Sequence, residues 1–245
     1  MPILPPPLGL KMKKAVASAF SPSDIAGLQL WLDATTGLFD ATSGGNAVTT
    51  DGSAVARWED QSGNGRHATQ TTLNNRPVLK TSVKNGKNVL RFDGDNDGLQ
   101  ITSYALGSSP SYSVFIVIYQ NGLKFAVWLE GGNLNPYLST VASVNKGFRH
   151  FDGSNSFDVT DTTEDLWNLF SYRQSTTARN YFRNNGTIST GTASTRAATF
   201  EYIGRSNNGF YYKGDIAELV IYSSYLSDSN RELVRDYLNT KWSVY

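Results

Sequence analysis

Short runs of β-branched and aromatic residues, separated by turn residues, constrain the fold of this chain more than any other feature. Charged residues make up only 18% of its 245 residues, against an average of about 25%. The chain shows no alternation of strands with helices. These features predict one all-β domain over residues 21–245, a two-sheet antiparallel jelly-roll sandwich. Turn signals between the expected strands include Gly44-Gly45, Asn85-Gly86, Asp152-Gly153 and Asn207-Asn208-Gly209.

Hydrophobic periodicity places two strands of this sandwich. Leu28, Leu30 and Leu32 occupy every second position, which predicts a half-buried first strand. The run at residues 216–222 is apolar on both faces except at Glu218, which predicts a central strand packed between two layers.

Two Asn-Gly turns predict β-hairpins. Residues 112–120 and 123–129 flank Asn121-Gly122, and residues 180–183 and 187–189 flank a turn at 184–186. Asn-Gly supplies the two positive φ angles of a type I′ turn, so each pair of runs is expected to lie side by side in one sheet.

One helix is predicted, at residues 228–241 near the end of the chain. Its apolar residues recur at helical spacing, so one face is expected to lie on the sandwich. Ser229 with Glu232 forms a possible capping box, with Ser227 as the alternative N-cap. At the start of the domain, Ser21 and Pro22 predict a short helical turn. The apolar positions of the long helix are Leu233, Val234, Tyr237, Leu238 and Trp242.

Residues 1–20 differ in composition from the rest and predict an extended tail. Four of the eight prolines lie there, at Pro2, Pro5, Pro6 and Pro7, and proline cannot donate to a sheet ladder. Apolar residues lie between them, so the tail is expected to order on another component of an assembly. The alternative is a disordered leader without a role. The apolar residues expected to make this contact include Ile3, Leu4, Leu8 and Leu10.

Charge and cysteine content exclude several functions. Lys plus Arg number 22 against 21 for Asp plus Glu, which gives a net charge of +1, so the basic footprint of a nucleic-acid or lipid-headgroup binder is absent. With no cysteine, disulfides and thiolate metal sites are excluded. No apolar run is long enough for a membrane span, and the first 20 residues do not match a signal peptide.

Several segments, in this order, resemble the concanavalin A-like (laminin G-like) jelly-roll family of bacterial and phage surface and virion proteins. They are residues 28–34, 58–68, 90–97 and 214–222, the last followed by residues 226–228 and the closing helix. The resemblance covers residues 21–245 and implies the sandwich fold. This fold carries lectins, glycoside hydrolases, adhesion domains and structural modules, so the resemblance does not by itself imply one function.

The acidic residues do not predict a glycosidase, which needs two carboxyl groups at a defined separation. Resemblance to the hydrolases of this fold would imply a strand with the sequence Glu-x-Asp-x-x-Glu, and this chain has no such sequence. Glu59-Asp60 and Glu164-Asp165 are adjacent pairs, which point to opposite faces of a strand. His67 and His150 have no recognisable nucleophile nearby in the sequence. We therefore expect no catalytic residues and no enzymatic activity.

The loop at residues 58–68 is polar but favours a structural interpretation. Trp58 is expected to anchor it in the core, and Gly63 and Gly65 to provide positive-φ turns. His67 is expected to make a hydrogen bond within the loop rather than to catalyse a reaction.

Asp93, Asp95 and Asp97 have the alternate spacing of the first positions of a Ca²⁺-binding loop. Position twelve of that motif is Tyr104 instead of glutamate, so an EF-hand is rejected. Two interpretations stay open, a polar turn between strands and a shallow structural Ca²⁺ site completed by backbone carbonyls or by Asp60 and Asn64. No other cofactor is predicted.

Aromatic residues beside turns are the candidates for carbohydrate binding. Trp128 and Tyr137 flank residues 130–133, which are rich in glycine and polar groups, and Tyr211 and Tyr212 follow the turn at residues 207–209. Flat aromatic faces next to Asn, Asp and Gly groups are suited to sugar rings.

The leading functional prediction is a non-catalytic binding or adhesion module, most plausibly a phage virion component such as a tail fibre or capsid decoration. It would assemble in the bacterial cytoplasm, contact other virion proteins through its tail, and bind host-surface glycans; self-association is also possible. One alternative is a bacterial carbohydrate-binding protein outside the cell or on its surface. Another is a divergent polysaccharide-cleaving enzyme.

Overall fold

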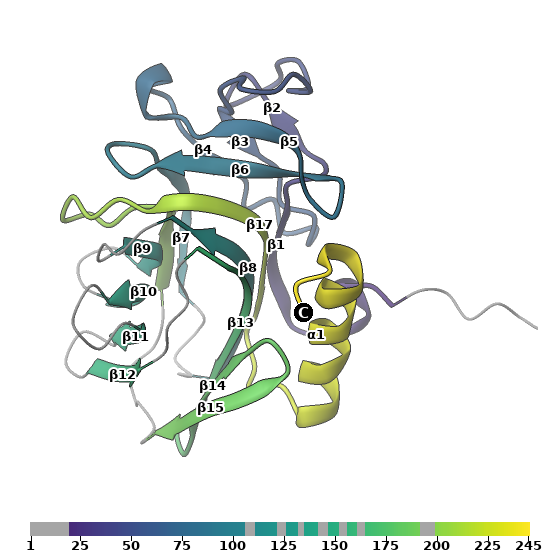
Figure 1. Ribbon diagram of the computed structural model, residues 1–245, viewed down its shortest axis with the longest axis vertical. Coiled ribbons are helices and arrows are strands. Elements are labelled where there is room, and N and C mark those ends of the chain that lie inside the picture. The colour runs from purple at the N-terminus through teal and green to yellow at the C-terminus, as the bar shows by residue number, and fades with distance from the viewer. Residues whose placement is uncertain are drawn as a thin grey trace, which may run out of the picture.

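The computed structural model describes residues 20–105, 111–121, 126–131, 135–141, 147–151, 156–160, 165–191 and 199–245. Most of the predicted tail, including Ile3, Leu4, Leu8 and Leu10, lies outside these ranges. The described residues form two antiparallel β-sheets and one α-helix, α1 (Asp228–Trp242). The predicted all-β sandwich with a C-terminal helix is therefore confirmed (Figure 1).

Sheet A contains the strands that carry the candidate site. β17 lies at its centre, because β8 pairs with one edge of β17 while β6 and β1 share the other edge. In order across the sheet, the strands are β15 (Gly186–Gly191), β14 (Arg179–Arg183), β13 (Trp167–Gln174), β8 (Tyr112–Gln120), β17 (Lys213–Tyr222), β6 (Lys87–Asp93) and β5 (Val78–Lys84), with β1 (Leu28–Asp33) on β17.

Sheet B forms the second layer and contributes no strand to that site. Its order is β12 (Ser156–Thr160), β11 (Gly147–Phe151), β10 (Asn135–Val141), β9 (Ala126–Gly131), β16 (Thr199–Ile203), β7 (Leu99–Ala105), β4 (Ala68–Thr69), β3 (Arg57–Trp58) and β2 (Leu38–Phe39). Two short 3₁₀ turns, η1 (Pro22–Asp24) and η2 (Leu73–Asn75), complete the described elements.

The main core lies between the two sheets. Leu30 and Leu32 of β1 are fully buried in it, as their alternation predicts, and Trp58 is buried there too. β17 contributes Ile216, and also Leu219 and Ile221, to the same core.

The opposite face of β17 packs under α1, so the prediction of a strand between two layers is confirmed. Ala217, Val220 and Tyr222 belong to a second apolar cluster, to which α1 contributes Val234 and Leu238. Figure 1 shows α1 on the side of sheet A that faces away from β9–β12. No helix in the described part of the chain is long and apolar enough to cross a membrane.

Both predicted helix starts form, with one choice of cap decided. The Ser21 side chain and Asp24 make a reciprocal capping box on η1. On α1 the N-cap is Ser227, whose hydroxyl accepts a hydrogen bond from the Asn230 backbone N–H at 3.2 Å. The alternative capping box that begins at Ser229 is therefore not the one formed.

A buried carboxylate also ties α1 to the sheet. Glu218 of β17 accepts hydrogen bonds from Trp31 Nε1 at 2.7 Å, Tyr237 OH at 3.0 Å and Trp242 Nε1 at 2.6 Å. It also forms an ion pair with Lys241, whose Nζ lies 2.7 Å from Glu218 Oε2. One glutamate thus joins β1, β17 and the last turns of α1.

One predicted hairpin is confirmed and the other is wrong. β14 and β15 pair across Asn184 and Asn185 as expected. In contrast, β8 belongs to sheet A and β9 to sheet B, so they do not form the hairpin predicted at Asn121-Gly122. β8 pairs with β13 on one edge and β17 on the other, which leaves no free edge for β9. Tertiary pairing has overridden the local turn preference.

We predict that Leu30→Asp prevents folding, because it places an unpaired charge in the core between the sheets. The burial penalty of several kcal/mol compares with a total stability of about 5 to 15 kcal/mol. Leu233→Asp is the matched control, since Leu233 lies exposed on α1. Soluble yield and thermal melting check the prediction, and an unchanged melting temperature for the Leu30 variant would contradict the register of β1.

Candidate functional site

A row of five side chains crosses the outer face of sheet A just beyond the end of α1. The pairing register places Trp167 opposite Tyr119, Tyr119 opposite Asp215, Asp215 opposite Arg91, and Arg91 opposite Val78. Directly paired residues in antiparallel strands point to the same face. Five adjacent strands, β13, β8, β17, β6 and β5, therefore each contribute one residue to a continuous surface.

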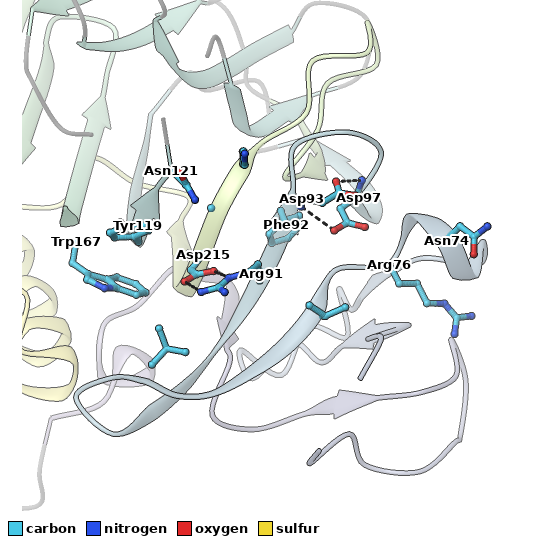
Figure 2. A pocket seen from close by; sticks show the side chains of 14 residues that line it. Asn74, Arg76, Arg91, Phe92, Asp93, Asp97, Tyr119, Asn121, Trp167 and Asp215 are labelled. Carbon is cyan, nitrogen blue, oxygen red and sulfur yellow. Dashed lines mark hydrogen bonds and ion pairs between the residues drawn. The ribbon is translucent and has the colours of Figure 1, made fainter. Parts of the chain in front are cut away.

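This row forms the floor of a pocket of about 650 Å³. Figure 2 shows Trp167 and Tyr119 at one end, the Arg91–Asp215 pair in the middle, and Asp93 and Asp97 further along. Pockets of this size accept small ligands, including short oligosaccharides. The remaining lining residues are Asn74, Arg76, Val83, Phe92, Asn121, Lys213 and Gly214, together with Val78 of the row.

A bidentate ion pair fixes the middle of the pocket. Arg91 Nε donates to Asp215 Oδ1 at 2.7 Å and Arg91 Nη2 donates to Asp215 Oδ2 at 2.9 Å. The Asp215 side chain is 2% exposed, whereas that of Arg91 is 46% exposed. The buried carboxylate raises the pKa of Arg91, so the guanidinium stays charged and held in place.

Two aromatic rings, those of Tyr119 and Trp167, form one end of the pocket. The ring centroids of Tyr119 and Trp167 lie 5.7 Å apart with planes inclined by 44°. Both side chains are only half-buried, so part of each ring faces the pocket (Figure 2). Apolar ring faces beside fixed polar groups are a common composition for a ligand site.

The structure places the predicted carbohydrate-binding residues elsewhere. Trp128 and Tyr212 are both 0% exposed, so the expectation that they lie on the surface is wrong. Trp128 stacks on Phe170 of the facing sheet, with centroids 5.1 Å apart. Tyr212 donates a hydrogen bond to the Tyr119 backbone carbonyl at 2.9 Å. Turn residues beside an aromatic side chain therefore did not indicate exposure.

Tyr137 and Tyr211 are half-buried, and neither lines the pocket. The Tyr137 ring stacks on Phe151 at 5.1 Å between centroids. Tyr211 follows Phe210, which is exposed on the loop between β16 and β17. The four predicted sugar contacts are thus not brought together by the fold, and the row on sheet A was not found from the sequence.

The polar loop at residues 58–68 is organised by its own hydrogen bonds. His67 Nδ1 accepts from the Asp60 backbone N–H at 3.1 Å, which confirms the predicted hydrogen bond within the loop. Asp60 Oδ1 accepts from the backbone N–H groups of Trp31 and Ser62, at 3.0 and 2.9 Å. Asn64 Nδ2 donates to the Leu28 carbonyl at 3.0 Å. Asp60 and Asn64 therefore hold this loop against β1.

The geometry of Asp93, Asp95 and Asp97 favours the polar turn. Asp93 Oδ1 accepts the backbone N–H groups of Asp95 at 2.8 Å and of Asn96 at 3.2 Å. Asp97 Oδ2 accepts the Asp93 N–H at 3.0 Å. Over the described residues, no group of three or more acidic, histidine or cysteine side chains is placed to hold a metal ion. The carboxylates of Asp93 and Asp97 accept hydrogen bonds within the turn between β6 and β7.

The sequence matches no protein-family model and no curated protein, but solved structures share its fold. Domain 4 of AbnA, a GH43 extracellular arabinanase from Geobacillus stearothermophilus, in complex with arabinotriose, has a TM-score of 0.55 at 19% identity, over 75% of this chain and 99% of that domain. The binding domain of Paraclostridial Mosquitocidal Protein 1 gives 0.59 at 14%, over 89% of this chain and 54% of that one. Trypanosoma rangeli sialidase in complex with sialic acid gives 0.56 at 14%, over 89% and 33%.

Identities this low show a shared β-sandwich fold and nothing about ligands. This chain also spans only about half of the mosquitocidal chain and a third of the sialidase chain. The fold implied by the resemblance to concanavalin A-like domains agrees with these matches.

We predict that Asp97→Asn stabilises the protein at pH 8. Burial, together with the charges of Asp93 and Asp95, raises the pKa of Asp97 from 3.8 to about 7. The folded protein holds a proton there that the unfolded chain releases, so stability falls as the pH rises from about 4 to about 7, by about 1.4 kcal/mol per pH unit. Asparagine keeps the acceptor for the Asp93 N–H without the charge. The melting temperature of the variant should exceed that of wild type at pH 8 and equal it near pH 4.

The same melting experiment, repeated with a chelator and with millimolar Ca²⁺, tests the calcium interpretation. We expect no shift with Ca²⁺ for either protein. A rise in the wild-type melting temperature that Asp97→Asn abolishes would show instead that these acids bind the cation.

Proposed function

We propose that this chain is a non-catalytic carbohydrate-binding module and that the pocket on the outer face of sheet A is its glycan site. The observation that carries the proposal is the half-exposed Trp167–Tyr119 pair beside the fixed Arg91–Asp215 pair in one pocket. A pyranose or furanose ring has apolar C–H faces and a polar edge of hydroxyl groups. The aromatic rings can pack against such a face while the guanidinium contacts the hydroxyl edge.

The matching structures support this class of function. One is a carbohydrate-degrading enzyme's domain in complex with arabinotriose, and another is the binding domain of a toxin. The pocket supports the proposal independently of those matches, because the pairing register of sheet A brings its residues together.

The hydrogen bonds and burial of the acidic side chains support a non-catalytic function. Asp215 is occupied by both donors of Arg91, and Asp93 by backbone N–H groups of its own turn. Glu218 is buried beneath α1, away from the pocket. Glu130 is also buried, and it accepts the Asn207 backbone N–H at 2.9 Å.

One observation favours the alternative of a divergent polysaccharide-cleaving enzyme. Asp97 lines the pocket, and burial raises its pKa to about 7, in the range of a general acid. A glycosidase would need a second, ionised carboxylate free to act on the sugar. Asp215 is held by Arg91 through both oxygens, and Asp93 is held by its own turn through Oδ1, so binding without cleavage is the better supported function.

The assembly to which such a module belongs stays a prediction. A virion component that recognises host glycans, attached through residues 1–19, is consistent with a compact binding domain preceded by an apolar, proline-rich segment. Its test is copurification of the chain with a native virion or cell-surface assembly.

We predict that Trp167→Ala weakens glycan binding, because the ring provides the main apolar contact for a sugar. On an array of bacterial and plant glycans, the affinity for the best ligand should fall by more than about tenfold, which corresponds to about 1.4 kcal/mol. Phe210→Ala is the control, since this exposed ring lies outside the pocket. Equal loss in both variants, or loss only in the control, would place the glycan site elsewhere.

We also predict that the protein releases no reducing ends from any polysaccharide it binds. Incubation of each array ligand with the protein, followed by a reducing-end assay, checks this. Sustained release that Asp97→Asn eliminates would establish the enzymatic alternative instead.

A further inference from the structure

We propose that the pocket binds an anionic glycan, one that carries a carboxylate or a sulfate, with the anion at the Trp167 end. This inference rests on the proposed carbohydrate-binding function and specifies the class of ligand. It is carried by two lysines without acidic partners, by free donors on the pocket floor, and by the absence from this end, among the described lining residues, of any acidic side chain other than the paired Asp215.

Lys84 lies beside Trp167 and directly follows Val83, and both of these residues line the pocket. Its Nζ is 5.9 Å from the centroid of the Trp167 ring. The side chain is half-buried, and burial alone lowers the pKa of Lys84. Among the described residues it forms no ion pair. A partly desolvated ammonium group without a counterion is unfavourable for the free protein, and an anionic ligand would relieve it.

A second lysine stands directly opposite. Lys87 of β6 is the cross-strand partner of Lys84 of β5, and it too has no acidic partner in the described part of the chain. Like charges at directly paired positions destabilise a sheet. Two lysines at directly paired positions project from the same face of the hairpin, so both can contact one carboxylate or sulfate.

The hairpin that carries these lysines is fixed in position. Asn85 and Gly86, the two residues between them, have φ angles of 48° and 68°, as a type I′ turn requires. Asn85 Nδ2 donates to the Lys241 backbone carbonyl of α1 at 2.9 Å. Both backbone positions are thus held at the pocket before a ligand arrives, although the side chains can still move.

At the Trp167 end, two hydrogen-bond donors on the floor of the pocket have no acceptor among the residues that the structure describes. Arg91 uses Nε and Nη2 on Asp215, which leaves Nη1 with its two N–H groups. The Trp167 indole N–H has no hydrogen-bond partner within the described ranges. Arginine and tryptophan side chains can only donate. With the Asp215 carboxylate already occupied, the free groups call for a ligand rich in acceptors.

Two of the three described acidic side chains that line the pocket lie at the end opposite Trp167. Asp93 and Asp97 belong to the turn between β6 and β7, and Asp93 is paired across the strands with Lys213. Figure 2 shows these two aspartates on the far side of the Arg91–Asp215 pair from Trp167. That end also holds the cations Arg76 and Lys213 among its lining residues, so its charges are mixed. Among the described residues that line the pocket, the lysine end has no acidic side chain other than the paired Asp215, which favours an anion there and sets the direction of the glycan.

The test is a glycan array printed as matched pairs. Each uronic-acid or sialic-acid glycan is paired with its carboxyl-reduced form, and each sulfated glycan with its desulfated form. We expect every tight ligand to carry a charge and to lose at least about tenfold in affinity without it, the effect of one charge-assisted hydrogen bond. The two sets of pairs show whether the carboxylate or the sulfate is the natural anion.

Variants of single lysines connect this preference to the site. Lys84→Gln should weaken binding of the best charged glycan by about tenfold without lowering the melting temperature, because it removes a desolvated charge. Lys84→Arg should restore most of the affinity. Lys80→Gln is the matched control, since Lys80 lies on the same strand but already pairs with Asp51.

The outcomes separate the two proposals. Equal affinity for charged and neutral partners, or an unaffected Lys84→Gln variant, would overturn the anionic assignment while leaving carbohydrate binding intact. Equal affinity for polyglutamate would overturn it as well, because charge alone would then explain the binding. Failure to bind any glycan on the array would overturn the proposed function itself.

Discussion

The buried carboxylate of Glu218 determines where α1 can lie, and thereby which part of sheet A stays uncovered. An ionised group without solvent needs partners for its charge and its lone pairs. Glu218 obtains them from Trp31 of β1 and from Tyr237, Lys241 and Trp242 of α1. Burial still raises its pKa, and the charge of Lys241 opposes that shift. A displacement of the helix along the sheet would break these contacts together, so the end of α1 is fixed.

A β-bulge makes this arrangement possible. Along β17, Ile216 pairs with Ile118 of β8 and Glu218 with Val117, so Ala217 is the additional residue. If β17 were regular at this point, Ile216 and Glu218 would point to the same face, and the carboxylate would enter the core between the sheets. The bulge turns Glu218 toward α1 while Asp215 keeps the same outer face. One carboxylate is thus enclosed under the helix, and the other, three residues earlier, forms the floor of the open pocket.

The sequence predicted the parts of this structure that depend on local patterns. The alternation of leucines in β1, the turn at residues 184–186 and the spacing of apolar residues in α1 each describe neighbours along the chain. The hairpin at Asn121-Gly122 failed because β8 finds both of its partners among distant strands. The prediction that Trp128 lies on the surface was wrong because β9 packs against β13 across the core. The site row was missed for the same reason, since Val78, Arg91, Tyr119, Trp167 and Asp215 meet only through the sheet register.

A site built in this way is rigid. Each member of the row projects from the hydrogen-bonded ladder of a different strand, and Asp215 further restrains Arg91. Little conformational entropy is left for a ligand to remove from these side chains, which favours recognition of one shape over adaptation to many. The same construction makes the site dependent on the whole sheet, because five separate strands must pair in register before the row exists. A ligand in the pocket therefore stabilises the assembled sheet as a unit, and binding at this surface is thermodynamically linked to folding.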